Sequence, residues 1–114
     1  MKFWNELNDL KGWEEALRQS QQVPVLVFKH STRCSISQMA LDRFERNWKQ
    51  GLEAEILPYY LDLLNHRDIS NEIARALDVE HQSPQLILIR NGQSIYSETH
   101  HAIRLDEALN ALKN

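Results

Sequence analysis

The sequence has a single cysteine, Cys34, among its 114 residues, so no disulfide can form within the chain. A lone cysteine is typical of the reducing cytosol, and we expect a cytoplasmic protein. Glycine and proline are scarce, at three residues each. No run rich in proline, glycine or serine divides the chain and no segment repeats, which predicts one domain over residues 1–114.

Long apolar runs and an excess of basic charge are also missing. The longest apolar stretches, such as residues 23–28, are far too short to cross a bilayer. Polar residues follow Met1 almost at once, unlike a signal peptide. The net charge is -3, which argues against binding to nucleic acid through phosphates. We therefore expect neither a membrane nor a nucleic-acid partner.

The hydrophobic pattern predicts alternating strands and helices. The expected elements are a short edge strand at 4–7, a helix capped by Asn8 or Asp9, a strand at 24–28, a helix that Gly51 ends, a strand at 56–63, a helix from Asp68 or Ser70, strands at 85–90 and 94–99, and a final helix over 105–112. This order, (β)αβαβαββα, predicts an α/β fold with a small mixed sheet of four to five strands flanked by about four helices.

Strand directions follow from the connections. Strands joined through a helix are expected to be parallel neighbours with right-handed crossovers, which applies to 24–28, 56–63 and 85–90. Asn91-Gly92 predicts a tight hairpin and hence an antiparallel strand at 94–99, whose alternating pattern suits an exposed edge. The strand at 24–28 is continuously apolar and is expected to be buried on both faces.

Cys34 lies where an inner strand gives way to a helix, the usual place for ligands in such sheets. Unpaired N–H groups at a helix N-terminus carry partial positive charge and stabilise a thiolate relative to a thiol. Arg33 and, more distantly, Lys29 and His30 add positive charge in the sequence nearby. A stabilised thiolate departs readily from a disulfide, which suits a cysteine that enters and leaves a mixed disulfide.

Ser37 occupies the position at which a C-x-x-C protein has its second cysteine. Its hydroxyl can hydrogen-bond a thiolate but cannot attack a disulfide. Any mixed disulfide on Cys34 must therefore be resolved by a thiol from outside the chain, which favours moving a small thiol on and off proteins.

Other interpretations of these residues stay open. A lone cysteine is often a buried apolar residue, although the polar, basic loop here favours reactivity. His30 could act as a base for Cys34 in a hydrolase-like pair, but no third member is evident. No metal site is expected, because Cys34 and the remaining histidines lack metal-ligand spacing, these histidines being His66, His81, His100 and His101.

Ser83-Pro84 precedes the strand at 85–90, which is expected beside the strand that leads to Cys34. A cis peptide bond at this point would turn the backbone of Ser83 toward the cysteine. It would also offer an edge with which an extended partner could pair.

The phrase V-F-K-H-S-T-R-C-S-I-S at 27–37, with A-L at 40–41 and F-E at 44–45, resembles the monothiol bacilliredoxins, the YtxJ-like family of the bacillithiol system. The similarity covers nearly the whole chain. The resemblance implies a thioredoxin-like fold, an active cysteine at Cys34 and a cis proline at Pro84. One departure is that a serine follows the cysteine, where many thioredoxin-like proteins have proline.

The activity implied by the resemblance is removal of bacillithiol from S-bacillithiolated proteins. Bacillithiol would be a co-substrate, with no bound cofactor, and its carboxylates could be held by Arg33, Lys29 and the helix N-terminus. The partners would be bacillithiolated proteins, bacillithiol, and a disulfide reductase or another bacilliredoxin. The expected site residues are Cys34 as the catalytic residue, Arg33, Ser35 and Ser37 as thiolate-stabilising residues, and Thr32, Ser83 and Pro84 as substrate-binding residues.

Two rival functions remain. A non-catalytic adaptor of the same fold would bind extended peptides near Ser83-Pro84 without using the thiol. A glutathione-type monothiol glutaredoxin with an iron–sulfur cluster would carry a glycine and a phenylalanine after the cysteine, and neither occurs in residues 34–37.

Overall fold

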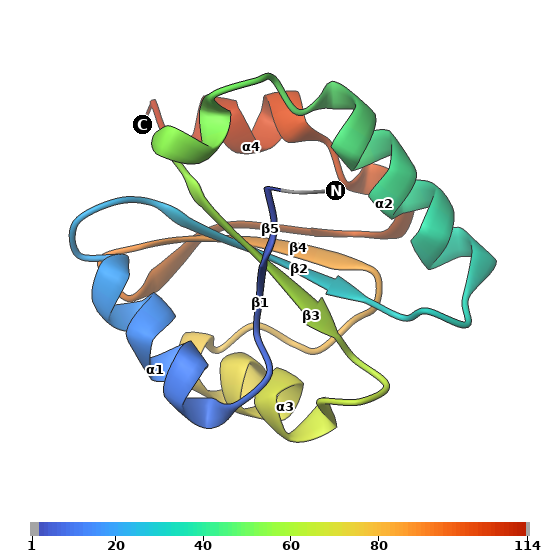
Figure 1. Cartoon of the computed structure of the whole chain (residues 1–114), viewed down its shortest axis with the longest axis horizontal. Coiled ribbons are helices and arrows are strands. Elements are labelled where there is room, and N and C mark those ends of the chain that lie inside the picture. The colour runs from blue at the N-terminus through green and yellow to red at the C-terminus, as the bar shows by residue number, and fades with distance from the viewer. Residues whose placement is uncertain (1–2, 114) are drawn as a thin grey trace.

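The computed structural model describes residues 3–113, which alternate between strands and helices in the expected order (Figure 1). The elements are β1 Asn5–Glu6, α1 Leu10–Gln19, β2 Val25–His30, α2 Ser35–Asn47, η1 Leu52–Ala54, β3 Leu57–Asp62, α3 Arg67–Leu77, β4 Gln85–Arg90, β5 Gln93–Thr99, η2 His100–Ala102 and α4 Leu105–Ala111. The prediction of an α/β fold with a small mixed sheet is confirmed.

The five strands form one sheet in the order β1-β3-β2-β4-β5. β1, β3 and β2 are mutually parallel, whereas β4 runs antiparallel to β2 and β5 antiparallel to β4. Helices α2 and α4 cover one face of the sheet and α1 and α3 cover the other (Figure 1). We refer to these as the α2 face and the α3 face.

β2 is buried on both faces, as the unbroken apolar run predicts. Its alternate residues supply two separate cores. Leu26 and Phe28 join the cluster on the α2 face, which includes Phe44, and Val25 and Val27 join the cluster on the α3 face. This alternation decides which way the chemically important residues of β2 point.

Two local signals behave as expected. The Asp9 side chain caps α1 by accepting a hydrogen bond of 2.7 Å from the N–H of Gly12. Asn91 and Gly92 both adopt positive φ, at 54° and 73°, and join β4 to β5 in a hairpin. β5 lies at the edge of the sheet, as predicted.

Three expectations were wrong. β4 is antiparallel to its inner neighbour, because the loop at 78–84 returns the chain to the edge at which β3 ends and places Gln85 opposite Lys29. α2 ends at Asn47 rather than at Gly51, since the backbone of Trp48 is extended and its ring packs against Phe44. α3 begins at Arg67, with His66 at its N-cap, rather than at Asp68 or Ser70.

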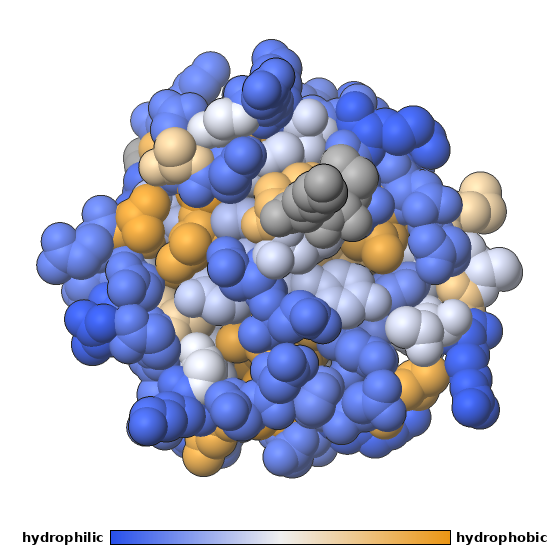
Figure 2. Space-filling model, viewed as in Figure 1, coloured by the Kyte–Doolittle hydropathy of each residue, from blue (hydrophilic) through white to orange (hydrophobic). Residues whose placement is uncertain are grey.

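The surface in the view of Figure 2 is mainly hydrophilic, with hydrophobic residues in small, separate areas. Within residues 3–113, no helix has the length and apolar character needed to cross a membrane.

Candidate functional site

Cys34 is the N-cap residue of α2 and is partly exposed to solvent. Its backbone is extended, with φ -109° and ψ 120°. The Cys34 N–H donates to the carbonyl of Ser31 at 3.2 Å, and the Cys34 carbonyl accepts from the N–H of Gln38 at 3.0 Å. A short turn after β2 therefore delivers the cysteine directly to the start of the helix. This site differs from that of a structural cysteine enclosed in a core.

The electrostatics at the start of α2 favour negative charge. The first turn contains no acidic residue that would offset the partial positive charge of the helix N-terminus. Arg33 and Ser35, on either side of the cysteine, are exposed, as is Thr32. The Cys34 side chain makes no capping hydrogen bond to the first turn of α2. The helix therefore acts on the sulfur through its dipole and the partial positive charge of the nearby N–H groups.

Ser37 is fully buried beneath this turn, and its hydroxyl faces the end of β2. The Ser37 Oγ lies 2.6 Å from Nδ1 of His30 and accepts a hydrogen bond of 3.1 Å from the N–H of Ser31. From the sequence, this hydroxyl was expected to stabilise the Cys34 thiolate, and neither of its two contacts was predicted. The face alternation of β2 is the signal that could have found them, because His30 shares its face with Leu26 and Phe28, under α2.

His30 carries little positive charge near neutral pH. The ring is buried, and this burial lowers the pKa of His30, with partial opposition from Asp62 and Gln38. The expectation that His30 adds positive charge beside Cys34 is therefore wrong. Its Nδ1 contacts the Ser37 hydroxyl, so the geometry gives no support to a hydrolase-like pair of His30 and Cys34.

Lys29 also fails the expectation that it assists the cysteine. Its side chain is fully buried on the α3 face, away from α2. The Lys29 Nζ donates to the Ser70 carbonyl at 3.2 Å and lies 3.5 Å from Nδ1 of His81. Burial lowers the pKa of Lys29 from 10.5 to about 8. Neighbouring side chains of a strand point to opposite faces, so adjacency in the sequence does not bring Lys29 to the site.

The Ser83–Pro84 peptide bond is cis, as the family resemblance implied. Pro84 directly precedes β4, whose first residue, Gln85, pairs with Lys29 one residue before the end of β2. The segment therefore lies at the sheet edge from which the Cys34 turn departs. The Ser83 hydroxyl is buried and has no hydrogen-bond partner among residues 3–113. Among the same residues, no group of three or more histidine, cysteine or acidic side chains could hold a metal ion.

A mixed five-stranded sheet with helices on both faces and a partly exposed cysteine at the start of α2 defines the thioredoxin-fold thiol oxidoreductases. Within this class, the family described as monothiol bacilliredoxin BrxC matches residues 5–108. The chain belongs to this family.

Solved structures agree with the class. A structure described as an oxidoreductase with a thioredoxin fold is 30% identical, with a TM-score of 0.80, over 96% of this chain and 94% of that one. The thioredoxin of Malassezia sympodialis (Mala s 13) is 14% identical, with a TM-score of 0.74, over 96% and 89% of the two chains. The thioredoxin of Fasciola hepatica is 11% identical, with a TM-score of 0.71, over 96% and 97%. These last two show the fold alone.

Proposed function

We propose that this protein removes bacillithiol from S-bacillithiolated proteins through a mixed disulfide on Cys34. The observation that carries the proposal is a partly exposed cysteine, the only one in the chain, at the N-terminus of α2 in a member of the bacilliredoxin family. The reaction belongs in the reducing cytoplasm, where a single free thiol persists and bacillithiol acts as a co-substrate rather than a bound cofactor.

The reaction consists of two thiol–disulfide exchanges. In the first, the Cys34 thiolate attacks the bacillithiol sulfur of the modified protein. The new S–S bond joins Cys34 to bacillithiol, and the protein leaves as a thiolate that takes a proton from water. In the second, the thiolate of another bacillithiol attacks the captured bacillithiol sulfur. Cys34 leaves as a thiolate, and the new S–S bond joins the two bacillithiol sulfurs. Over both steps the protein cysteine is reduced to a thiol, and two bacillithiol sulfurs are oxidised to bacillithiol disulfide.

The second exchange needs a thiol from outside the chain. Ser37 occupies the position of a resolving cysteine, and its hydroxyl is engaged by His30 and Ser31. Bacillithiol itself, a disulfide reductase or another bacilliredoxin would supply the attacking thiol.

The residues around Cys34 suggest how the substrate is held. Arg33 is exposed and positively charged, so it can attract the carboxylates of bacillithiol together with the helix N-terminus. Ser35 follows the cysteine in the first turn of α2 and presents its N–H there. We propose that Thr32 and the segment Ser83-Pro84 contact the protein part of the substrate.

The experiment is incubation of the reduced protein with bacillithiol disulfide, followed by intact-mass measurement. We expect one bacillithiol adduct, which reduced bacillithiol then removes. Cys34→Ser should give no adduct, and Ser97→Ala, an exposed change on β5, should behave as the unmodified chain does. An unreactive wild-type protein, or equal labelling of Cys34→Ser, would refute the proposal. If instead Cys34→Ser binds protein partners unchanged and the wild type never forms an adduct, the adaptor function is favoured.

A further inference from the structure

One face of α2 is uncovered from the position of Cys34 onward. Ile36 and Met39 are 43% and 65% exposed, unusual for large apolar side chains in this chain. Arg43 and Arg46 continue the same face, because positions three and four apart in a helix are neighbours. These four residues, the α2 stripe, are apolar close to Cys34 and cationic farther along the helix.

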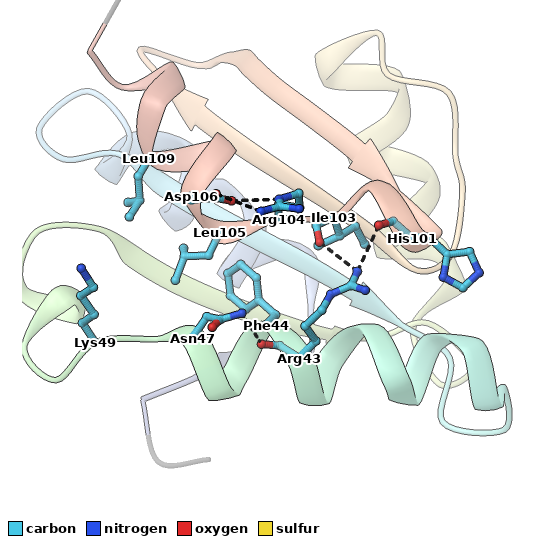
Figure 3. A pocket seen from close by; sticks show the side chains of 10 residues that line it. All are labelled: Arg43, Phe44, Asn47, Lys49, His101, Ile103, Arg104, Leu105, Asp106 and Leu109. Carbon is cyan, nitrogen blue, oxygen red and sulfur yellow. Dashed lines mark hydrogen bonds and ion pairs between the residues drawn. The ribbon is translucent and has the colours of Figure 1, made fainter.

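Two hollows follow the α2 stripe and together form what we call the α2–α4 groove. The smaller, of about 200 Å³, is lined by Met39, Ala40, Asp42, Arg43, Arg46 and His101. The larger, of about 370 Å³, lies between α2 and α4 and shares Arg43 and His101 with the first. Figure 3 shows Phe44 and Leu105 projecting into it, with His101 at one end and Lys49 at the other.

The groove has an excess of positive charge, because its lining carries four cationic residues, Arg43, Arg46, Lys49 and Arg104, against the two carboxylates of Asp42 and Asp106. Arg43 donates to the carbonyls of Ile103 and His101, at 3.0 and 3.2 Å, so these contacts leave its charge without an anionic counterpart. Arg104 is paired with the carboxylate of Asp106 at 3.2 Å. The side chains of Arg46 and Lys49 have no hydrogen bond or ion pair with any residue between 3 and 113. This cationic groove belongs to a chain whose net charge is -3.

The α2 stripe and the groove point to a polypeptide occupant whose chemistry is complementary. We propose that the groove binds an extended segment of the protein substrate, with an apolar residue beside the modified cysteine and acidic residues four to six positions from it. This inference rests on the proposed function and adds a substrate preference to it.

The spacing comes from the helix. At about 1.5 Å per residue, Arg43 and Arg46 lie roughly 14 and 18 Å along α2 from Cys34. An extended chain spans about 3.3 Å per residue, so it reaches these cations at its fourth to sixth residue from the reacting cysteine.

Synthetic peptides that carry one bacillithiolated cysteine test the inference. The acidic peptides have leucine next to the cysteine and glutamates four and six positions away, on the N-terminal side in one and on the C-terminal side in the other. Matched peptides carry lysine in place of glutamate. We expect one acidic peptide to show a kcat/KM about five- to tenfold above its lysine counterpart at low salt, and a smaller advantage at about 0.5 M salt. Serine in place of the leucine should lower kcat/KM about threefold.

Charge reversal in the protein supplies the control. Arg46→Glu should remove most of the preference for the acidic peptide, and Lys49→Glu, beyond the end of α2, should remove a smaller part of it, with each rate normalised to the reaction of that variant with bacillithiol disulfide. Lys11→Glu reverses an exposed charge on α1, across the sheet, and should keep the preference. Equal rates for acidic and basic peptides, with a normal reaction toward bacillithiol disulfide, would overturn this inference and leave the proposed function standing. Failure of Cys34 to react with bacillithiol disulfide would overturn the proposed function itself.

Discussion

The buried Lys29 on the α3 face offers the sharpest test of the electrostatics of this fold. The substitution is Lys29→Met, which keeps an unbranched side chain of similar length in the same pocket. The change leaves both former partners with other contacts. The Ser70 carbonyl lies inside α3, where a helix N–H bonds to it, and Nδ1 of His81 lies 3.0 Å from the Ser70 hydroxyl.

The magnitude follows from the pKa of the ammonium group. Burial lowers the pKa of Lys29 from 10.5 to about 8. At about 1.4 kcal/mol per pH unit, keeping this lysine charged at pH 7 costs the folded state about 3 kcal/mol. Removing the charge also removes the hydrogen bond to the Ser70 carbonyl. We therefore expect Lys29→Met to raise the free energy of unfolding at pH 7 by about 1–3 kcal/mol.

The free energies of unfolding of the wild type and of Lys29→Met should also depend differently on pH. Between pH 8 and 10.5 the unfolded chain binds more protons at Lys29 than the folded chain does. The free energy of unfolding of the wild type should therefore rise with pH through this range, by up to about 1.4 kcal/mol per unit, relative to Lys29→Met. The tyrosines are the same in both proteins, so their contribution to the pH dependence cancels when the two stability curves are subtracted.

The assay is urea unfolding of both proteins between pH 6.5 and 9.5, with the bacillithiol disulfide reaction measured at pH 7. The rate of adduct formation should change less than about twofold, because Lys29 faces away from Cys34. Two results would refute the reasoning: a Lys29→Met protein that is less stable than the wild type at pH 7, or parallel stability curves across the whole pH range.

Two further predictions concern Ser37 and His30, the buried polar pair on the α2 face. Ser37→Ala should lower the free energy of unfolding by about 2–3 kcal/mol, because both hydrogen-bond partners of the hydroxyl are then left unpaired. In the same urea series Ser97→Ala should change it by less than about 0.5 kcal/mol, and equal effects would contradict the assignment. Burial lowers the pKa of His30 and His81, so the unfolded chain binds the extra protons and stability should fall from pH 7 to 5.5. His30→Asn, which keeps an acceptor for Ser37, should reduce that slope, and an unchanged slope would exclude His30 as its source.

Much of the fold could be predicted, because its strongest signals are local. A short unbroken apolar run rich in valine favours a strand buried on both faces, and β2 is one. Asn91-Gly92 satisfies the positive φ of a tight hairpin, and the chain turns there. The position of Cys34 between a strand and a helix follows from the change of hydrophobic period in the sequence.

The remainder depends on contacts between distant segments. The direction of β4 is set by how the loop at 78–84 returns to the sheet, and no local pattern encodes that path. The contact of His30 with Ser37 depends on α2 packing over β2, and that of Lys29 with Ser70 depends on α3 packing on the opposite face. The same packing buries both residues, and burial lowers the pKa of His30 and of Lys29.

The same alternation limits which groups can attract an anionic thiol to Cys34. Three basic residues precede the cysteine within five positions, but β2 turns Lys29 toward α3 and His30 into the core beneath α2. Arg33 lies beyond the end of the strand, where the period of two no longer applies, and of the three it alone is exposed. Lys29 lies across the sheet from α2, and burial lowers the pKa of His30, so the proposed attraction of a carboxylate-bearing thiol rests on Arg33 and the N-terminus of α2. A count of charges along the sequence overstates this attraction, and the pleat of the strand explains why.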